Sequence, residues 1–142
     1  MSKSNAFETD LLGLIFNGTA IANLAINATA SPLTNLFISL HTADPGEAGT
    51  QSTSETAYTG YARVSVARTA GGWTITGNSV SPVTPIDFPE CTAGTSTITH
   101  FAVGVAASGA SKILYKGTVT PNINVAINVI PRLKTTSTIT ED

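Results

Sequence analysis

Hydrophobic and polar residues follow two periods along this chain, a helical one near the start and a strand-like one after it. From residue 5 to residue 17, apolar side chains recur every three or four positions, which predicts a short amphipathic helix. Asn5 can cap the first turn together with Glu8, and Gly18 stands just past the last turn, where a left-handed cap is expected. The predicted apolar stripe consists of Phe7, Leu11, Leu12, Leu14 and Ile15.

From residue 36 onward the pattern is that of β-strands, in which side chains alternate between two faces. Gly, Pro and Asn separate the alternating segments about every ten residues, which gives about eight short strands. Gly71-Gly72 predicts a hairpin turn, and Pro121 predicts a break between two strands. The predicted strands cover residues 36–41, 61–66, 73–77, short edge pieces around 83 and 86–88, 97–105, 112–120, 122–129 and 133–140.

This order of elements predicts a mainly β fold, an antiparallel β-sandwich of the jelly-roll type with a short N-terminal α-helix. At 142 residues the chain is expected to form a single domain over residues 1–142. Within it, residues 1–35 form an N-terminal helical arm and loop, and residues 36–142 form the sandwich.

Most of the polar residues that could carry chemistry lie between residues 36 and 68. This stretch predicts a buried strand, a turn at Asp44-Pro45-Gly46, a long polar loop over residues 47–59 and a second strand. In the second strand, Ala62, Val64 and Val66 are expected to face the core, with Arg63 on the opposite face. The polar loop is expected to be exposed and to contact a partner.

Charged residues make up only 11% of the chain, and the net charge is -2. The seven Lys and Arg residues are spread thinly, so no cluster exists that could neutralise a row of phosphates, and no nucleic-acid partner is expected. No apolar run reaches membrane-spanning length, and no membrane partner is expected. Cys91 is the single cysteine, and we expect it to be a buried small hydrophobe rather than a reactive thiol.

His41, Asp44, Glu47 and His100 are the only group that resembles a set of metal ligands. Two histidines without a third ligand motif are a weak signal, and an Asp before Pro usually bonds its own backbone in a turn. The sequence therefore predicts no metal site and no cofactor.

Asp87 and Glu90 are paired carboxylates of the kind used in glycoside hydrolysis. They lie in a Pro-rich edge region, where solvated carboxylates are the commoner case. No Gly-x-Ser-x-Gly motif and no phosphate-binding loop is present, so no catalytic residue is predicted and the protein is not expected to be an enzyme.

Four aromatic residues could form a stacking platform for a sugar. Aromatic residues make up only 6% of the chain, however, and a tryptophan that begins an alternating strand is more often part of a core. The four candidates are Tyr58, Tyr61, Trp73 and Tyr115.

Several motifs along the chain carry a family resemblance. The first is Leu36-Phe-Ile-Ser-Leu-His-Thr-Ala-Asp-Pro-Gly-Glu-Ala-Gly, followed by Tyr58-Thr-Gly-Tyr-Ala-Arg-Val. The others are Asn5-Ala-Phe-Glu with Leu11-Leu12 and Ile15-Phe-Asn, Trp73-Thr-Ile-Thr-Gly-Asn, Phe88-Pro-Glu-Cys-Thr, Thr99-His-Phe-Ala-Val-Gly and Thr140-Glu-Asp. As a set, these motifs resemble a family of small virion proteins from tailed bacteriophages, and the resemblance covers nearly the whole chain.

The resemblance implies a capsid cement (decoration) protein, a non-enzymatic jelly roll made in the host cytoplasm that binds the outer surface of the virion capsid. The implied partners are the major capsid protein and further copies of the chain, as a homo-oligomer (dimer or trimer). Some members of the family are labelled tail-fibre proteins. The alternative is therefore a tail-fibre or tail-spike component that contributes to host-receptor (glycan) recognition.

Overall fold

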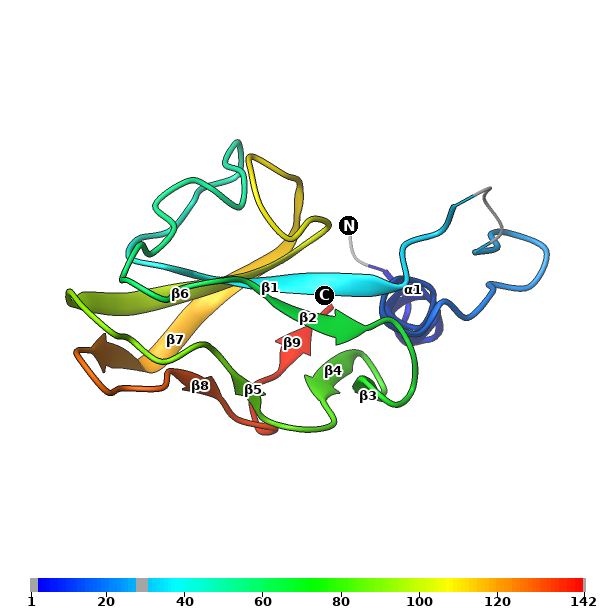
Figure 1. Ribbon diagram of the computed structural model, residues 1–142. Coiled ribbons are helices and arrows are strands. Elements are labelled where there is room, and N and C mark those ends of the chain that lie inside the picture. Colours follow the sequence, from blue (N-terminus) through cyan, green and yellow to red (C-terminus); the bar gives the residue numbers. More distant parts are fainter. Residues whose placement is uncertain (1–2, 28–30, 142) are drawn as a thin grey trace. The chain divides into compact units, whose positions relative to one another are not determined.

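The computed structural model describes residues 3–27 and 31–141, which belong to two compact units (Figure 1). Unit 1 comprises residues 1–35, 67–85 and 134–142, and unit 2 comprises residues 36–66 and 86–133. The described residues form one α-helix and nine β-strands with antiparallel pairing. The predicted mainly β, antiparallel fold with one N-terminal helix is confirmed and is consistent with a β-sandwich, whereas the single domain stays a prediction.

The helix α1 spans Asn5–Asn17, which are the predicted bounds. Its N-cap is Ser4, one residue earlier than predicted: the Ser4 hydroxyl accepts a hydrogen bond from the N–H of Phe7 at 3.4 Å. At the other end, Gly18 adopts the predicted left-handed conformation (φ 65°), and its N–H bonds the carbonyl of Gly13.

The buried face of α1 differs from the predicted stripe. Leu12 and Phe16 are fully buried, whereas Phe7 is 36% exposed. Phe16 packs edge-on against Trp73, with ring centroids 4.7 Å apart. The helix therefore packs on its own unit through a face centred one position later than the sequence suggested.

Unit 1 contains a three-stranded sheet of order β3-β4-β9. A two-residue turn at Gly77-Asn78 joins β3 to β4, since Thr76 is paired with Ser79. The predicted hairpin at Gly71-Gly72 is wrong: these residues make a local turn before β3, and the strand before them, β2, belongs to another sheet. The strands are β3 (Trp73–Thr76), β4 (Ser79–Pro82) and β9 (Ile139–Thr140).

Unit 2 is built on a four-stranded sheet of order β2-β1-β6-β7. A second, two-stranded sheet pairs β5 with β8. The strands are β1 (Asn35–His41), β2 (Val64–Ala67), β5 (Ile86–Asp87), β6 (Ser96–Gly104), β7 (Ile113–Val125) and β8 (Arg132–Leu133). The apolar core includes Leu36, Ile38, Leu40, Phe88, Ile98, Ala102, Val103 and Val125.

The strand β7 differs from its prediction in two ways. Pro121 does not end it, because β7 lies at the edge of the sheet, where a residue without an N–H is tolerated. Beyond Val125 the predicted alternation stops: Ile127 is 59% exposed and Asn128 adopts a left-handed turn conformation (φ 69°). The two predicted strands over residues 112–129 are thus one strand and a turn.

Part of the predicted N-terminal arm and loop over residues 1–35 falls outside the described residues, which omit residues 1–2 and 28–30. Between α1 and residue 28, Ile21 and Ala25 exchange backbone hydrogen bonds across a tight turn. Within the described ranges, no helix is both long and apolar enough to cross a membrane.

Candidate functional site

The polar loop over residues 47–59, hereafter the contact loop, is the candidate functional site of unit 2. It follows the predicted turn, which is confirmed: Gly46 has φ 75°, and its N–H donates to the Asp44 carboxylate at 2.8 Å. The loop then runs back beside the end of β1. Thr42 N–H bonds the carbonyl of Ser54, and Thr56 N–H bonds the carbonyl of Leu40, both at 2.9 Å. Its backbone is therefore held like an irregular extra strand.

Arg63 ties the contact loop to a second loop of unit 2. Its Nε and Nη2 atoms both donate to the carboxylate of Glu55 at 2.7 Å, which is a bidentate ion pair. The same guanidinium donates to the carbonyls of Ala106 at 3.0 Å and Gly109 at 2.8 Å. The Arg63 side chain is only 2% exposed, so the predicted outward orientation is wrong. Ala62, predicted to face the core, is exposed.

Gln51 fastens the middle of the contact loop to β1. Its amide nitrogen donates to the carbonyl of Phe37 at 2.9 Å and to the Ser39 hydroxyl at 3.1 Å. Its amide oxygen accepts from the Ser111 hydroxyl at 2.7 Å, and its backbone N–H bonds the Ser111 carbonyl at 2.9 Å. The side chain is fully buried with its polar atoms paired.

His41 makes a third connection and is also fully buried. Its Nδ1 lies 2.8 Å from the carbonyl of Thr53, and its Nε2 lies 2.9 Å from the Ser39 hydroxyl. A carbonyl can only accept, so Nδ1 carries the proton and Nε2 accepts from Ser39 in the neutral ring. Burial lowers the pKa of His41. The carbonyl of Thr53 and the carboxylate of Glu55 raise this pKa in part, whereas Arg63 and His100 lower it further.

Two tyrosines complete the base of the contact loop. The Tyr61 hydroxyl donates to Glu55 at 2.8 Å and accepts from the backbone N–H of Leu40 at 3.1 Å. The Tyr58 hydroxyl donates to the carbonyl of Pro89 at 2.8 Å, and burial raises the pKa of Tyr58 to about 12. Burial likewise raises the pKa of Tyr61. Both phenols are structural donors, held protonated in the range where proteins function.

The contact loop is therefore not the wholly exposed segment that the sequence predicted. Gln51, Thr56 and Tyr58 are buried, and the charged pair beneath them is satisfied within the protein. Besides the carboxylates of Asp44 and Glu47, the polar side chains that the loop and its flanks present to solvent carry hydroxyl groups. The hydroxyl-bearing residues are Thr42, Ser52, Thr53, Ser54 and Thr59. Beyond Glu47 at its start, the contact loop forms a stiff, hydroxyl-rich surface and presents no activated nucleophile.

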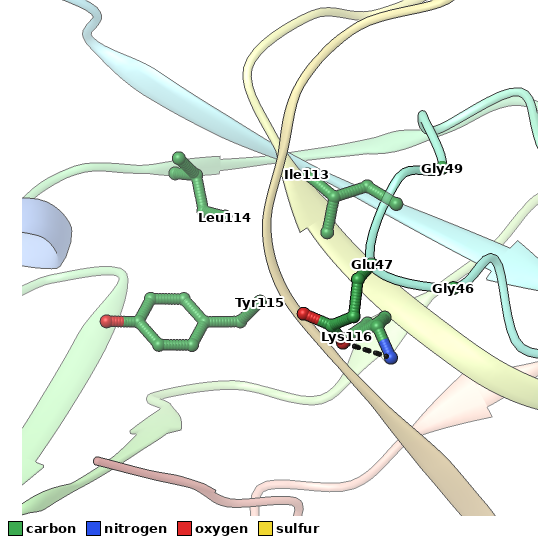
Figure 2. Close-up of a pocket in the computed structure, with 7 residues that line it drawn as sticks. All are labelled: Gly46, Glu47, Gly49, Ile113, Leu114, Tyr115 and Lys116. Carbon is green, nitrogen blue, oxygen red and sulfur yellow. Dashed lines mark ion pairs between the residues drawn. The ribbon is translucent and has the colours of Figure 1, made fainter. Parts of the chain in front are cut away.

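A shallow hollow of about 240 Å³ lies between the start of the contact loop and β7. In Figure 2, the side chains of Ile113 and Lys116 lie on the side of the loop, whereas Leu114 and Tyr115 point away from it. Glu47 forms an ion pair with Lys116 at 3.1 Å. The hollow is smaller than the roughly 300 Å³ at which small-molecule sites usually begin.

The four residues that resemble metal ligands are engaged with other protein groups. Asp44 and Glu47 both pair with Lys116, and the N–H of Gly46 followed by the Lys116 ammonium lowers the pKa of Asp44. His41 uses both ring nitrogens within the loop network, as described above. His100 is the register partner of His41 on β6, and its Nδ1 lies 2.8 Å from the Thr99 hydroxyl. Within residues 3–27 and 31–141, no three acidic, His or Cys side chains converge as a metal site would require.

The remaining candidates also have structural partners. Asp87 forms a bidentate ion pair with Arg132, which lowers the pKa of Asp87, so this carboxylate is held as a paired anion. Glu90 is exposed. Cys91 is buried as predicted, with its thiol 3.3 Å from the carbonyl of Ala93.

The structure does not bring the four aromatic candidates together as one exposed platform. Trp73 belongs to unit 1 and is 3% exposed, packed against Phe16. In unit 2, Tyr58 is 5% exposed, and its ring meets that of Tyr61 edge-on at 5.4 Å. Tyr115 borders the hollow beside β7.

Sequence reasoning missed Gln51, which joins β1, the contact loop and residue Ser111. Nothing in its local sequence distinguishes it from the Thr and Ser residues around it. The sequence feature that could have revealed its position is Gly104. An isolated glycine in an alternating strand indicates that another group approaches the backbone closely.

The chain is similar to a family of known proteins. The model of the family described as "Podophage GP4 fiber I protein gp80" matches residues 2–140. No curated protein matches the chain. Since the match covers almost the entire chain and the fold is the expected β-rich one, the chain belongs to this phage fiber protein family and is a structural protein of the virion.

Proposed function

We propose that this protein is a fibre subunit of the phage virion and that it binds a neighbouring virion protein through the contact loop. The observation that carries the proposal is the family match over residues 2–140. The contact loop supplies the means, because a loop held by Arg63, Gln51 and His41 does not need to be ordered when a partner binds.

The surface chemistry favours a protein partner over a glycan. Sugar-binding surfaces usually present aromatic faces, but Tyr58 and Trp73 are buried and the Tyr61 hydroxyl is committed to Glu55. The exposed hydroxyls of the loop suit hydrogen bonds to a partner's backbone and amide side chains. Host-glycan recognition by this loop is therefore the less favoured form of the fibre hypothesis.

Capsid cement is the second candidate function, with the major capsid protein as partner. It is favoured by the composition, since a surface with 11% charged residues repels its neighbours weakly and suits close packing on a lattice. A protein that binds only the assembled lattice stabilises it by mass action. The contact loop would serve this role equally well.

Imaging of virions that carry a tagged form of the protein distinguishes the two functions. The fibre hypothesis expects the tag on tail fibres, and a tag distributed over the head would contradict it in favour of cement.

A pair of variants tests the loop itself. Ala48→Arg with Ala57→Arg places two large cations on exposed positions of the contact loop and should prevent incorporation into virions. Ala126→Arg, an exposed alanine elsewhere in unit 2, is the matched control and should be incorporated normally. Equal incorporation of both proteins would show that the contact loop is not the interface.

A further inference from the structure

The two most exposed large hydrophobic side chains of the described residues, Ile26 (70%) and Leu24 (69%), lie two positions apart in unit 1. Leu33, in the same unit, is 44% exposed. These residues belong to a segment here called the apolar loop, which comprises residues 21–27 together with Leu33. Exposed apolar side chains that cluster in this way usually mark a surface that a partner covers.

The apolar loop is fixed at its base by Arg68. The guanidinium donates from one nitrogen, Nη1, to the Asn27 side-chain oxygen at 3.2 Å and to the carbonyl of Leu33 at 2.6 Å. These two residues are therefore neighbours in space. Its other nitrogens donate to the carbonyls of Leu14 and Ile15 at the end of α1, at 2.8 and 2.7 Å. Arg68 therefore holds the apolar loop in a fixed position at the end of α1.

The tip of the apolar loop is a closed turn. Ile21 and Ala25 exchange backbone hydrogen bonds at 2.8 and 3.0 Å, with Asn23 in a left-handed conformation between them. Ile21 itself is 8% exposed and anchors the turn, whereas Leu24 points its side chain into solvent. The turn therefore displays its apolar residues in a defined conformation, which lowers the entropic cost of binding.

Charge indicates what covers the apolar loop. No Asp, Glu, Lys or Arg occurs from residue 11 to residue 43, so the loop and both its flanks are uncharged. Arg68, the nearest cation, is fully engaged with carbonyl and amide oxygens. Such a surface can meet its own symmetry mate without placing like charges opposite each other, although each chain has a net charge of -2.

We propose that the apolar loop is the surface through which copies of this chain associate, by packing Leu24, Ile26 and Leu33 of neighbouring copies around a symmetry axis. This inference does not depend on whether the protein serves as fibre or cement, because it concerns the subunit contact and not the contact loop. It gives the homo-oligomer implied by the family resemblance a defined contact surface.

Sedimentation analysis of the full chain tests the proposal. The wild type should form a discrete oligomer, and Leu24→Asp with Ile26→Asp should raise its dissociation constant at least 100-fold and give monomers. The matched control is Ile127→Asp with Ile130→Asp, which changes two isoleucines of unit 2 that are 59% and 54% exposed. This control should keep the oligomer, and circular dichroism of each variant verifies folding. If the double aspartate variant does not fold, Leu24→Ser with Ile26→Ser replaces it.

Two results would overturn the proposal. The first is a wild-type chain that stays monomeric at all concentrations, and if its apolar-loop variant also fails to bind virions, a different virion protein covers the loop. The second is an oligomer that survives the changes at Leu24 and Ile26. The first result leaves the contact-loop variants of the proposed function to be judged by virion incorporation alone.

Discussion

The side-chain amide of Gln51 lies where a Cβ atom of residue 104 would be, so that only glycine fits at this position of β6. The carbonyl of Phe37 and the hydroxyl of Ser39 hold the Gln51 amide there. The glycine in the strand and the glutamine in the loop are therefore one structural feature, although 53 positions separate them in the sequence.

Gly104→Ala should expel Gln51 and loosen the contact loop. Overpacking of this kind costs about 1–3 kcal/mol of stability, which urea denaturation measures. Gly13→Ala is the control, because a Cβ there meets Thr19 at an ordinary 3.6 Å, and a helical Gly-to-Ala change is neutral or stabilises by up to about 1 kcal/mol. Equal effects of the two substitutions would refute the steric argument.

Arg63→Met should leave the Glu55 carboxylate uncompensated beneath the contact loop and reduce stability by about 3 kcal/mol. Hydrogen exchange should rise at the Thr42 and Thr56 amides, which depend on the loop position. Adding Glu55→Leu removes the isolated charge and should restore part of the loss. Strictly additive effects of the two changes would show that the ion pair does not couple these residues.

The stability of unit 2 should decrease as the pH falls below about 6.5. Because the ring is buried, the folded-state pKa of His41 lies below the ordinary histidine value of 6.5, so between these two pKa values the unfolded chain binds more protons than the folded one. The contribution of neutral His41 to the stability of unit 2 is complete above about pH 7 and is lost as the pH falls toward the folded-state pKa. Thermal melts at pH 7.5 and 5 measure it, and His41→Gln should have a smaller difference between the two. If His41→Gln loses as much stability between pH 7.5 and pH 5 as the wild type does, other groups cause the pH dependence.

Arg68→Met should destabilise unit 1 by about 2–3 kcal/mol, because the carbonyls of Leu14, Ile15 and Leu33 lose a charged donor. Amide exchange at Thr19 and Ile21 should increase as the end of α1 and the apolar loop loosen. Arg132→Met serves as the comparison, since its ion pair with Asp87 is exposed, and should change the melting temperature little.

Local sequence signals predicted the elements that local interactions decide. The bounds of α1, the left-handed Gly18 after it and the turn at Asp44 all follow from caps and turn residues whose partners lie within a few positions. The same reasoning missed the cap by one residue, because Ser4 and Asn5 are both good caps and only the backbone geometry separates them.

The contact loop could not be predicted because its residues are positioned by partners far along the chain. Alternation placed Arg63 on an exposed face, but Ala106 and Gly109 provide carbonyls that satisfy its guanidinium in a buried position. Gln51 depends in the same way on Ser111. Composition describes such residues as surface polar residues, and only tertiary structure shows that they form the interior of a loop.

The predicted hairpin at Gly71-Gly72 and the predicted strand break at Pro121 were wrong for a related reason, since both depend on tertiary context. A pair of glycines permits a hairpin but does not require one, and the hairpin forms instead at Gly77-Asn78, where the flanking residues Thr76 and Ser79 pair. Pro121 breaks a central strand but not an edge strand, and the sequence alone did not show that β7 is at the edge.

The position of β7 has a consequence for a protein that is crowded in a particle. An open strand edge can recruit the edges of other molecules and grow into an unlimited sheet. Along β7, irregularities opposite Ile98–His100 and Val103–Gly104 interrupt the ladder, Pro121 removes a donor, and Lys116 adds a charge. These features hinder the pairing of β7 with a strand edge of another molecule and so oppose the growth of an unlimited sheet.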